Sequence, residues 1–338
     1  MTRREWIALT TTAAVVQAET NPSIIGDGWG LDHFMIALAD PVLVKSTYAE
    51  KLGFTVLRGA KRPGGHENAN IVLAPAYIEL IFLYDRRKAE ASDDRITKRN
   101  LSKIDQGGGA IAYNVEVSPI DRAVAQLRER GMEVELAPPT MLLLGDGTQV
   151  RGPWQFLRFT KPVQPPPPRG VPGGEGVGFL EYDDREWWKN VPSVPVFSDP
   201  RRPSVEAHAN TARRMRSVWV AVTSASDAVR RSQSFGFPEL GEQKSALLRA
   251  KGREVKCGQG SIVFWESTNP KSRLSDLIGK QGLGPFGISI EVADLRAARE
   301  IVRKGAGKQR LIEGEGRKQS FVVTPDLTGG IWLEFVQA

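Results

Sequence analysis

The chain has 338 residues, of which 41% are hydrophobic and 25% are charged, so it is globular and long enough to bury two cores. Its 46 Lys and Arg residues exceed its 39 Asp and Glu residues, but the basic residues form short clusters mixed with acidic ones. This distribution argues against a nucleic-acid partner, because a net charge of this size is usual for a solvated surface. The single cysteine, Cys257, excludes an internal disulfide and fits any compartment.

The first eighteen residues resemble a twin-arginine export signal. They carry Arg3 and Arg4, then a short apolar stretch, and then Ala18 as a small-residue cleavage site. The apolar stretch is too short to span a bilayer, and no other segment is suited to it. We therefore expect residues 1–18 to direct export to a periplasmic or extracellular location, without stable membrane insertion. The alternative is a leader that stays attached to a cytoplasmic protein.

Residues 30–85 predict a compact unit of a strand, a helix and further strands. The opening strand carries Asp32 and His33, and the last strand carries Glu79 in an apolar run. A carboxylate in such a run is costly to bury unless it is paired or coordinated. His33 and Glu79 are therefore the best candidates for a metal or active site. The alternatives are an ordinary core or surface histidine and an edge strand with Glu79 in solvent.

The following segment, residues 86–109, is charged and is expected to be a turn-rich connector. An alternating strand pattern follows it, and then a helical pattern begins at Ile120. Further strands are expected over residues 132–136, residues 154–160 and the segment that contains Glu181. The proline-rich stretch 162–172 is expected to be a loop, because prolines cannot donate to a sheet interior.

The same order of strand, helix and strands begins again at Ser217 and at Phe286. Four units of one order imply duplication within the chain. We therefore expect two domains, at residues 30–189 and 217–338, joined by an irregular linker at residues 190–216.

This fourfold order resembles the vicinal oxygen chelate superfamily, and the first half resembles its glyoxalase-like domain branch. The residues that carry the resemblance are Asp32, His33, Asp40, Leu52, Gly53, Phe54, Gly64, Gly65, Asn68, Ala69, Tyr77, Ile78, Glu79 and Leu80, with His208 and Asn210 before the third unit. The resemblance covers nearly the whole chain. It implies an α+β fold in which tandem βαβββ units form two cupped mixed sheets, with a ligand or metal inside the cup.

The resemblance also implies a divalent metal ion held by the first and last strands of paired units. Imidazole nitrogen and carboxylate oxygen suit such an ion. In the second unit the position that matches His33 falls near Ala112, and the last strand offers Glu181. The expected metal ligands are His33, Glu79, His208 and Glu181. The expected proton carriers are Glu79 and Glu181, and the expected substrate contacts are His66, Asn68 and Tyr113.

The second half is poor in ligands. The positions that match His33 fall near Ser217 and Gly287, Glu334 is the only obvious ligand type, and no histidine follows His208. A ring-cleaving dioxygenase of the extradiol type, which needs two histidines and a carboxylate, is therefore disfavoured. We expect an exported glyoxalase-like protein, monomeric or homodimeric, that acts on a small oxygenated metabolite as a metal-dependent lyase or isomerase. The alternative is a non-catalytic protein that binds or sequesters a small molecule with the same fold.

Overall fold

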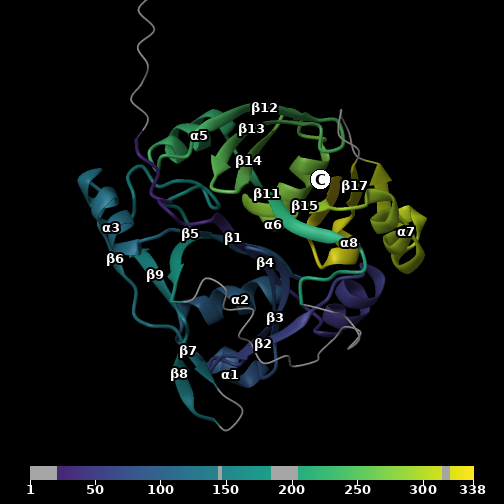
Figure 1. Ribbon diagram of the computed structural model, residues 1–338, viewed down its shortest axis with the longest axis horizontal. Helices are drawn as coiled ribbons and strands as arrows, with labels where there is room; N and C mark the ends of the chain where they lie inside the picture. Colours follow the sequence, from purple (N-terminus) through teal and green to yellow (C-terminus); the bar gives the residue numbers. More distant parts are fainter. Residues whose placement is uncertain (1–20, 144–146, 184–204, 314–319) are drawn as a thin grey trace, which may run out of the picture.

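The computed structural model describes residues 21–143, 147–183, 205–313 and 320–338. The expected export signal at residues 1–18 and most of the expected linker lie outside these ranges. Two large, curved mixed sheets dominate the described part of the chain (Figure 1).

The strands of the first sheet are β1 (Gly30–Ala37), β2 (Leu57–Lys61), β3 (His66–Leu73), β4 (Ala76–Leu83), β5 (Gly109–Glu116), β6 (Val134–Leu136), β7 (Met141–Leu143), β8 (Gln149–Arg151), β9 (Trp154–Phe159) and β10 (Val177–Tyr182). The strands of the second sheet are β11 (Ala212–Val222), β12 (Glu239–Ser245), β13 (Ala250–Cys257), β14 (Gly260–Ser267), β15 (Gly284–Val292), β16 (Leu311–Glu313), β17 (Ser320–Val323) and β18 (Trp332–Gln337). The helices are η1 (Val44–Lys51), α1 (Arg86–Ala91), α2 (Arg95–Asp105), α3 (Ile120–Glu129), α5 (Ala225–Gln233), α6 (Arg273–Gln281), α7 (Leu295–Ala306), η2 (Lys308–Arg310) and α8 (Pro325–Thr328).

The two sheets repeat one strand order. The first runs β6-β9-β10-β5-β1-β4-β3-β2-β7-β8, and the second runs β12-β13-β14-β11-β15-β18-β17-β16. In the first sheet, β1 is parallel to β4 and antiparallel to β5; in the second, β11 is parallel to β14 and antiparallel to β15. The α+β class with tandem units in two mixed sheets is confirmed.

The segment expected to be a turn-rich connector instead forms α1 and α2. Each helix begins at an aspartate, because Asp85 accepts from the Lys88 amide and Asp94 accepts from the Thr97 amide. The buried face of α2 includes the polar residue Asn100. The usual apolar stripe of a packed helix is therefore interrupted, and this is why the sequence pattern did not indicate a helix.

One hydrophobic core runs through both halves of the chain. The rings of Phe179 on β10 and Phe235 after α5 stack with a centroid distance of 5.6 Å. The Tyr48 hydroxyl of η1 donates to the carbonyl of Thr328 at the end of α8. The two sheets therefore form one packed body.

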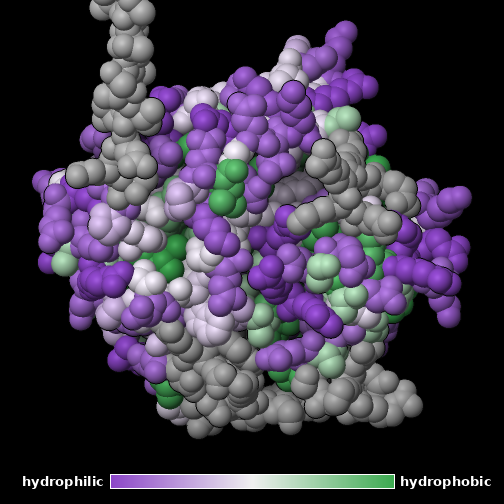
Figure 2. Space-filling model, turned by 45° about the horizontal axis from the view of Figure 1, so that its top comes forward, coloured by the Kyte–Doolittle hydropathy of each residue, from purple (hydrophilic) through white to green (hydrophobic). Residues whose placement is uncertain are grey.

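The face in Figure 2 is mostly hydrophilic, with apolar side chains scattered over it. In the described ranges, no helix combines the length and the apolar character needed to cross a membrane.

Candidate active site

The candidate site begins at an irregularity in β1. The ladder between β1 and β5 shifts register after Leu31, so that Asp32 and His33 together face the single residue Asn114. This is a β-bulge, which re-aims side chains by adding one residue to one strand of a pair. Both Asp32 and His33 consequently reach the interior of the first sheet, which we call the first cup.

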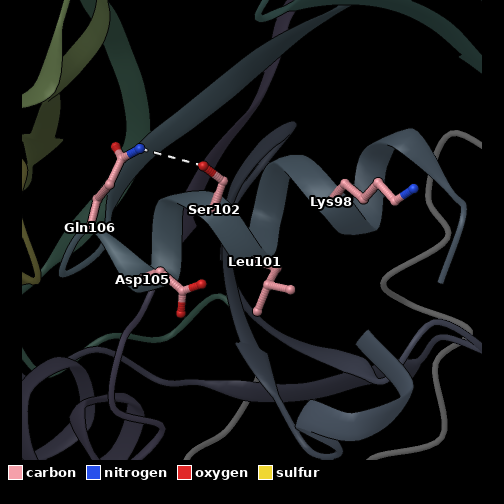
Figure 3. Close-up of a pocket in the computed structure, with 5 residues that line it drawn as sticks. All are labelled: Lys98, Leu101, Ser102, Asp105 and Gln106. Carbon is pink, nitrogen blue, oxygen red and sulfur yellow. Dashed lines mark hydrogen bonds between the residues drawn. The ribbon is translucent and has the colours of Figure 1, made fainter. Parts of the chain in front are cut away.

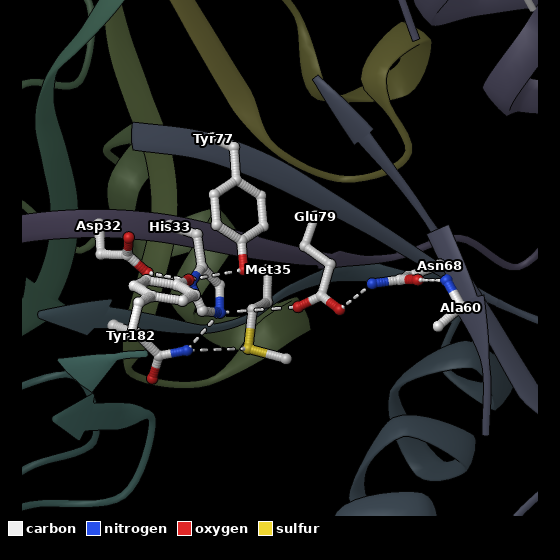
Figure 4. A network of polar contacts seen from close by, with 9 residues as sticks. Asp32, His33, Met35, Ala60, Asn68, Tyr77, Glu79 and Tyr182 are labelled. Carbon is white, nitrogen blue, oxygen red and sulfur yellow. Dashed lines mark hydrogen bonds and ion pairs between the residues drawn. The ribbon is translucent and has the colours of Figure 1, made fainter. Parts of the chain in front are cut away.

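The imidazole of His33 is held in one orientation. Its Nδ1 is hydrogen-bonded to Oδ2 of Asp32, which also accepts from the Tyr182 hydroxyl at 3.0 Å (Figure 4). The Tyr77 ring stacks on the imidazole with a centroid distance of 4.5 Å. Burial, followed by the Asp32 charge, raises the pKa of Tyr77 and of Tyr182 well above 10, so both hydroxyls remain donors. Because a carboxylate only accepts, Nδ1 of His33 donates to Asp32, and Nε2 is the ring nitrogen that faces Glu79 and Asn114.

The carboxylate of Glu79 faces Nε2 of His33. Oε2 of Glu79 lies 3.6 Å from Nε2 of His33, and the two side chains are almost fully buried. Oε1 of Glu79 accepts from Nδ2 of Asn68 at 2.5 Å, while Oδ1 of Asn68 accepts from the Ala60 amide at 2.6 Å. The hydrogen bond from the Ala60 amide fixes which end of the Asn68 side chain faces Glu79 (Figure 4). Oε1 of Glu79 is bound by Asn68, and Oε2 is the oxygen that points towards His33.

Asn114 completes the immediate surroundings of the imidazole. Its Nδ2 lies 2.5 Å from Nε2 of His33 and 3.7 Å from Sδ of Met35. With Nδ1 donating to Asp32, Nε2 of His33 accepts from the Asn114 amide, and Oε2 of Glu79 is a second acceptor 3.6 Å away, so a ligand donor at this point would replace the Asn114 contact. The geometry can therefore take up a proton from a bound molecule.

The donors do not fit a preformed metal centre. His33 and Glu79 are strong ligand types, and the oxygen of Asn114 is a weaker third. Across the described ranges, no group of three or more His, Cys, Asp and Glu side chains is placed to hold an ion. A catalytic zinc centre takes three protein ligands, so this set is one strong donor short.

His208, expected to be a ligand, lies at the junction of the two halves. Its Nδ1 accepts from the Thr55 amide at 2.9 Å, and its Nε2 is 2.7 Å from the carbonyl of Val72. The neighbouring Asn210 donates to the carbonyl of Leu52 at 2.8 Å. Both ring nitrogens are therefore engaged with backbone, and the structure does not bring His208 to His33 and Glu79.

Glu181 and Tyr113 also lie away from the pair. Glu181 accepts from the Ser118 hydroxyl at 2.6 Å and from the Ile120 amide at 3.1 Å, so it caps the start of α3. The Tyr113 side chain lies within the main core, and its hydroxyl donates to the carbonyl of Gly170 at 2.8 Å. In β10 it is Tyr182, the residue after Glu181, whose side chain reaches the cup.

His66 lies on the same face of the sheet as Glu79, because both belong to the paired strands β3 and β4 at positions of matching alternation. Burial, and secondly the Arg62 guanidinium, lower the pKa of His66 to about 4. The ring is therefore neutral at neutral pH. Its Nδ1 is buried without a hydrogen-bond partner among the described residues.

Helix α2 lies across the first cup. Its Ile104 packs in one cluster with Ala37, Ile81 and Ala112, which belong to β1, β4 and β5. The outer side of α2 lines an open pocket of about 380 Å³, formed by Lys98, Leu101, Ser102, Asp105 and Gln106 (Figure 3). The inner side faces the sheet that carries His33 and Glu79.

Sequence reasoning missed Asn114 and the contributions of Arg62 and α2. The match to His33 was expected near Ala112, two residues early, because alternation alone does not reveal a bulge. The guanidinium of Arg62 lies 5.2 Å from the ring centroid of Trp154, over the cup. The alternating polar positions of β5 offered a signal for Asn114, whereas none pointed to Arg62.

Comparisons with known proteins agree with this fold. The sequence profile of a family described as "Glyoxalase-like domain" matches residues 31–236. No curated protein matches the chain. A triple mutant of 4-hydroxymandelate synthase from Streptomyces coelicolor is 10% identical, with a TM-score of 0.57 over 91% of this chain and 92% of that one. A hypothetical protein from Staphylococcus aureus is 11% identical, with a TM-score of 0.54 over 91% and 99% of the two chains. At these identities the likeness concerns the fold.

Proposed function

Because the chain belongs to the glyoxalase-like domain family, we propose that its first cup binds a small oxygenated metabolite and transfers a proton to and from it. The observation that carries the proposal is the oriented imidazole. Asp32 holds Nδ1 of His33, and Nε2 faces Glu79 at 3.6 Å in a buried interior. This is the arrangement of a general base held by a carboxylate.

In the proposed reaction, His33 removes a proton from a carbon or hydroxyl next to a carbonyl group. The charges of Asp32 and Glu79 stabilise the imidazolium that forms. Asn68 keeps Glu79 in place through its 2.5 Å hydrogen bond. In an isomerase, the same imidazolium returns the proton at a neighbouring position. In a lyase, the electron pair left by the removed proton forms a double bond and expels a group from the adjacent carbon, and the imidazolium protonates that leaving group.

The resemblance implies a divalent ion as cofactor, and His33 and Glu79 are the two strong donors that would hold it. Because a catalytic zinc centre takes three protein ligands, the proposed proton transfer is assigned to protein side chains alone. Metal analysis of the purified protein measures whether an ion binds, and loss of that ion in the His33→Ala, Glu79→Ala double variant would assign it to the first cup.

A second candidate function is binding without turnover. The specific observation that favours it is the incomplete donor set around His33 and Glu79. A sequestering protein needs a cup with specific polar contacts and no proton carrier.

Proton exchange distinguishes the two functions. Neutral and acidic 2-oxo and 2-hydroxy compounds are incubated with the protein in heavy water, and exchange at carbon is followed by NMR. We expect exchange with the wild type and a loss of about 10²- to 10⁴-fold in His33→Gln, the usual contribution of a general base. Glu79→Gln is also expected to slow exchange, because it removes a charge that stabilises the imidazolium, and Glu242→Gln, which changes an exposed carboxylate on β12, is its matched control. Binding of a probe without any His33-dependent exchange would favour the second function.

We also propose that residues 1–18 direct export. Replacement of Arg3 and Arg4 by lysine is expected to keep the protein in the cytoplasm, as cell fractionation would measure. Secretion unchanged by this replacement would contradict the twin-arginine route.

A further inference from the structure

Arg62 is a half-buried cation that forms no ion pair with a carboxylate of the described residues. It follows β2, and the Tyr84 hydroxyl fixes its carbonyl through a 3.0 Å hydrogen bond. Its guanidinium lies over the Trp154 ring, and Nη1 is buried without a hydrogen-bond partner among the described residues. Buried charges are ordinarily paired, so a guanidinium in this position indicates a missing negative group.

Helix α2 contributes a second group of the same kind. Nε of Arg99 is buried, and within the described ranges it has no partner. The adjacent Asn100 is 1% exposed, and neither its Nδ2 nor its Oδ1 has a partner in the same part of the chain. Asn100 lies one turn before Ile104, which packs on the cup strands, so its amide faces the cup.

The Trp154 ring below the Arg62 guanidinium packs edge-on against Tyr182, which donates to Asp32. The charge of Glu79 acts on both arginines. Burial lowers the pKa of Arg62, and the Glu79 carboxylate is the main influence that raises it. The pKa of Arg99 is also lowered by burial, and Glu79 is among the charges that act against this. His66 is influenced by Arg62, Glu79 and Arg99 together. The two guanidiniums therefore act on the same interior as the proposed base.

Arg169 is a partly buried arginine whose guanidinium donors are bound by backbone carbonyls, and it serves as a comparison for Arg62 and Arg99. Its guanidinium donates to the carbonyls of Ala110, Ile111 and Leu283 at 2.6 to 3.3 Å, and it ties the two sheets together. Arg62 and Arg99 make no comparable set of bonds to described residues. Their free donors are available to a ligand.

We propose that the first cup selects an anionic substrate, whose carboxylate or phosphate group is bound by Arg62 and Arg99 with the Asn100 amide as a further donor. The planar guanidinium fork matches both kinds of oxyanion. This inference rests on the proposed function, because it names the substrate class of the same cup. The anion would hold the reacting carbon or hydroxyl near His33.

Calorimetry with matched acid and amide probes tests the inference. Lactate is expected to bind at least about tenfold more tightly than lactamide, because a charged hydrogen-bonded pair supplies most of the affinity. Arg62→Met and Arg99→Met are each expected to reduce lactate affinity about tenfold or more and to leave lactamide unchanged. Arg87→Met, which removes an exposed guanidinium on α1, is the matched control. Inorganic phosphate as a competitor shows whether the site takes phosphate as well as carboxylate.

Equal affinity for acid and amide, retention of lactate affinity in both arginine variants, or no binding of lactate or phosphate would each overturn the inference. Arg62→Lys, which keeps the charge, is expected to retain part of the affinity, and unchanged thermal unfolding shows that the variants fold. His33→Gln is expected to keep lactate binding while proton exchange is lost. Lactate binding that depends on the arginines, without proton exchange, would therefore reject the proposed proton transfer and keep the anion site. Proton exchange with equal affinity for lactate and lactamide would reject the anion site and keep the proposed proton transfer.

Discussion

The two sheets place different side chains at equivalent positions. His33 on β1 pairs with Tyr77 on β4, and the corresponding pair of the second sheet is Ser217 with Ser261. Two residues further on, Met35 pairs with Glu79 in the first sheet. The second sheet has Trp219 paired with Val263 there.

The interior of the second sheet is mainly apolar, and its Ser289 hydroxyl accepts from Nε1 of Trp219 at 3.1 Å and donates to Glu334. The apolar side chains form one cluster that includes Trp219, Trp265, Phe286 and Trp332, together with Leu274 and Leu277 of α6. Helix α6 follows β14 as α2 follows β4, so the two helices are structural counterparts. Helix α2 turns Asn100 towards its sheet, whereas α6 turns leucines towards its own. The same strand order thus gives a first cup with polar groups that have no partner among the described residues and a second cup filled mainly by aromatic and aliphatic side chains.

The largest expected effect is on the proton-exchange rate, and it should differ between His33 in the first cup and Ser217 at the equivalent position of the second. His33→Gln is expected to lower the proton-exchange rate about 10²- to 10⁴-fold, because it removes the base. Ser217→Ala, at the matching position, is expected to leave the rate unchanged. NMR exchange rates measure both. A comparable loss in Ser217→Ala would place function in both cups.

The packing of the second cup is expected to dominate stability. Trp265→Ala should lower the free energy of unfolding by about 3–5 kcal/mol, since it leaves a large cavity in an apolar cluster. Arg62→Met in the first cup should cost much less, because it removes an unpaired buried charge. Urea denaturation measures both changes. A Trp265→Ala cost below about 1 kcal/mol would show that the second cup is not tightly packed.

The first cup is expected to lose stability in mild acid. The pKa of His66 is about 4 in the folded protein, chiefly through burial, and about 6.5 in an unfolded chain. The unfolded state therefore binds more protons between these values, and stability falls as the pH is lowered from 6.5 to 4, by at most about 1.4 kcal/mol per pH unit. Urea midpoints across this range should fall less steeply in His66→Gln. Equal slopes would contradict the assignment.

The smallest expected effect concerns the starts of α2 and α6. Burial raises the pKa of Asp94, but hydrogen bonds from Thr97 outweigh it and leave the pKa below its usual value. The stability that this cap gives is present above the ordinary aspartate pKa and is lost as the pH falls through the lowered one. Helix α6 begins at Ser272, which does not titrate. Asp94→Ala should cost about 1 kcal/mol, and hydrogen exchange at low pH should increase in α2 before α6. Simultaneous loosening of both helices would argue against the cap.

The fourfold order of strand and helix, with the resemblance that it carries, was sufficient to predict the fold, and strand alternation predicted the face on which Glu79 lies. Alternation was not sufficient for Asn114, because a bulge changes which residues face one another without changing the polar pattern. The engagement of His208 with the backbone of Thr55 and Val72 depends on contacts between distant segments. Helix α2 was missed because its buried face is partly polar. The division into two domains and the oligomeric state stay predictions.

The bulge in β1 has a counterpart. In the ladder between β11 and β15, the register shifts between Met215 and Ser217, so that Arg216 and Ser217 occupy the places of Asp32 and His33. The irregular backbone is thus common to both halves, while the acid and base groups are confined to one. The same backbone irregularity therefore accommodates an aspartate and a histidine in one half and an arginine and a serine in the other. Arg216 and Ser217 are therefore the positions at which an aspartate and a histidine could be introduced into the second half, together with smaller residues in place of Trp219 and its neighbours.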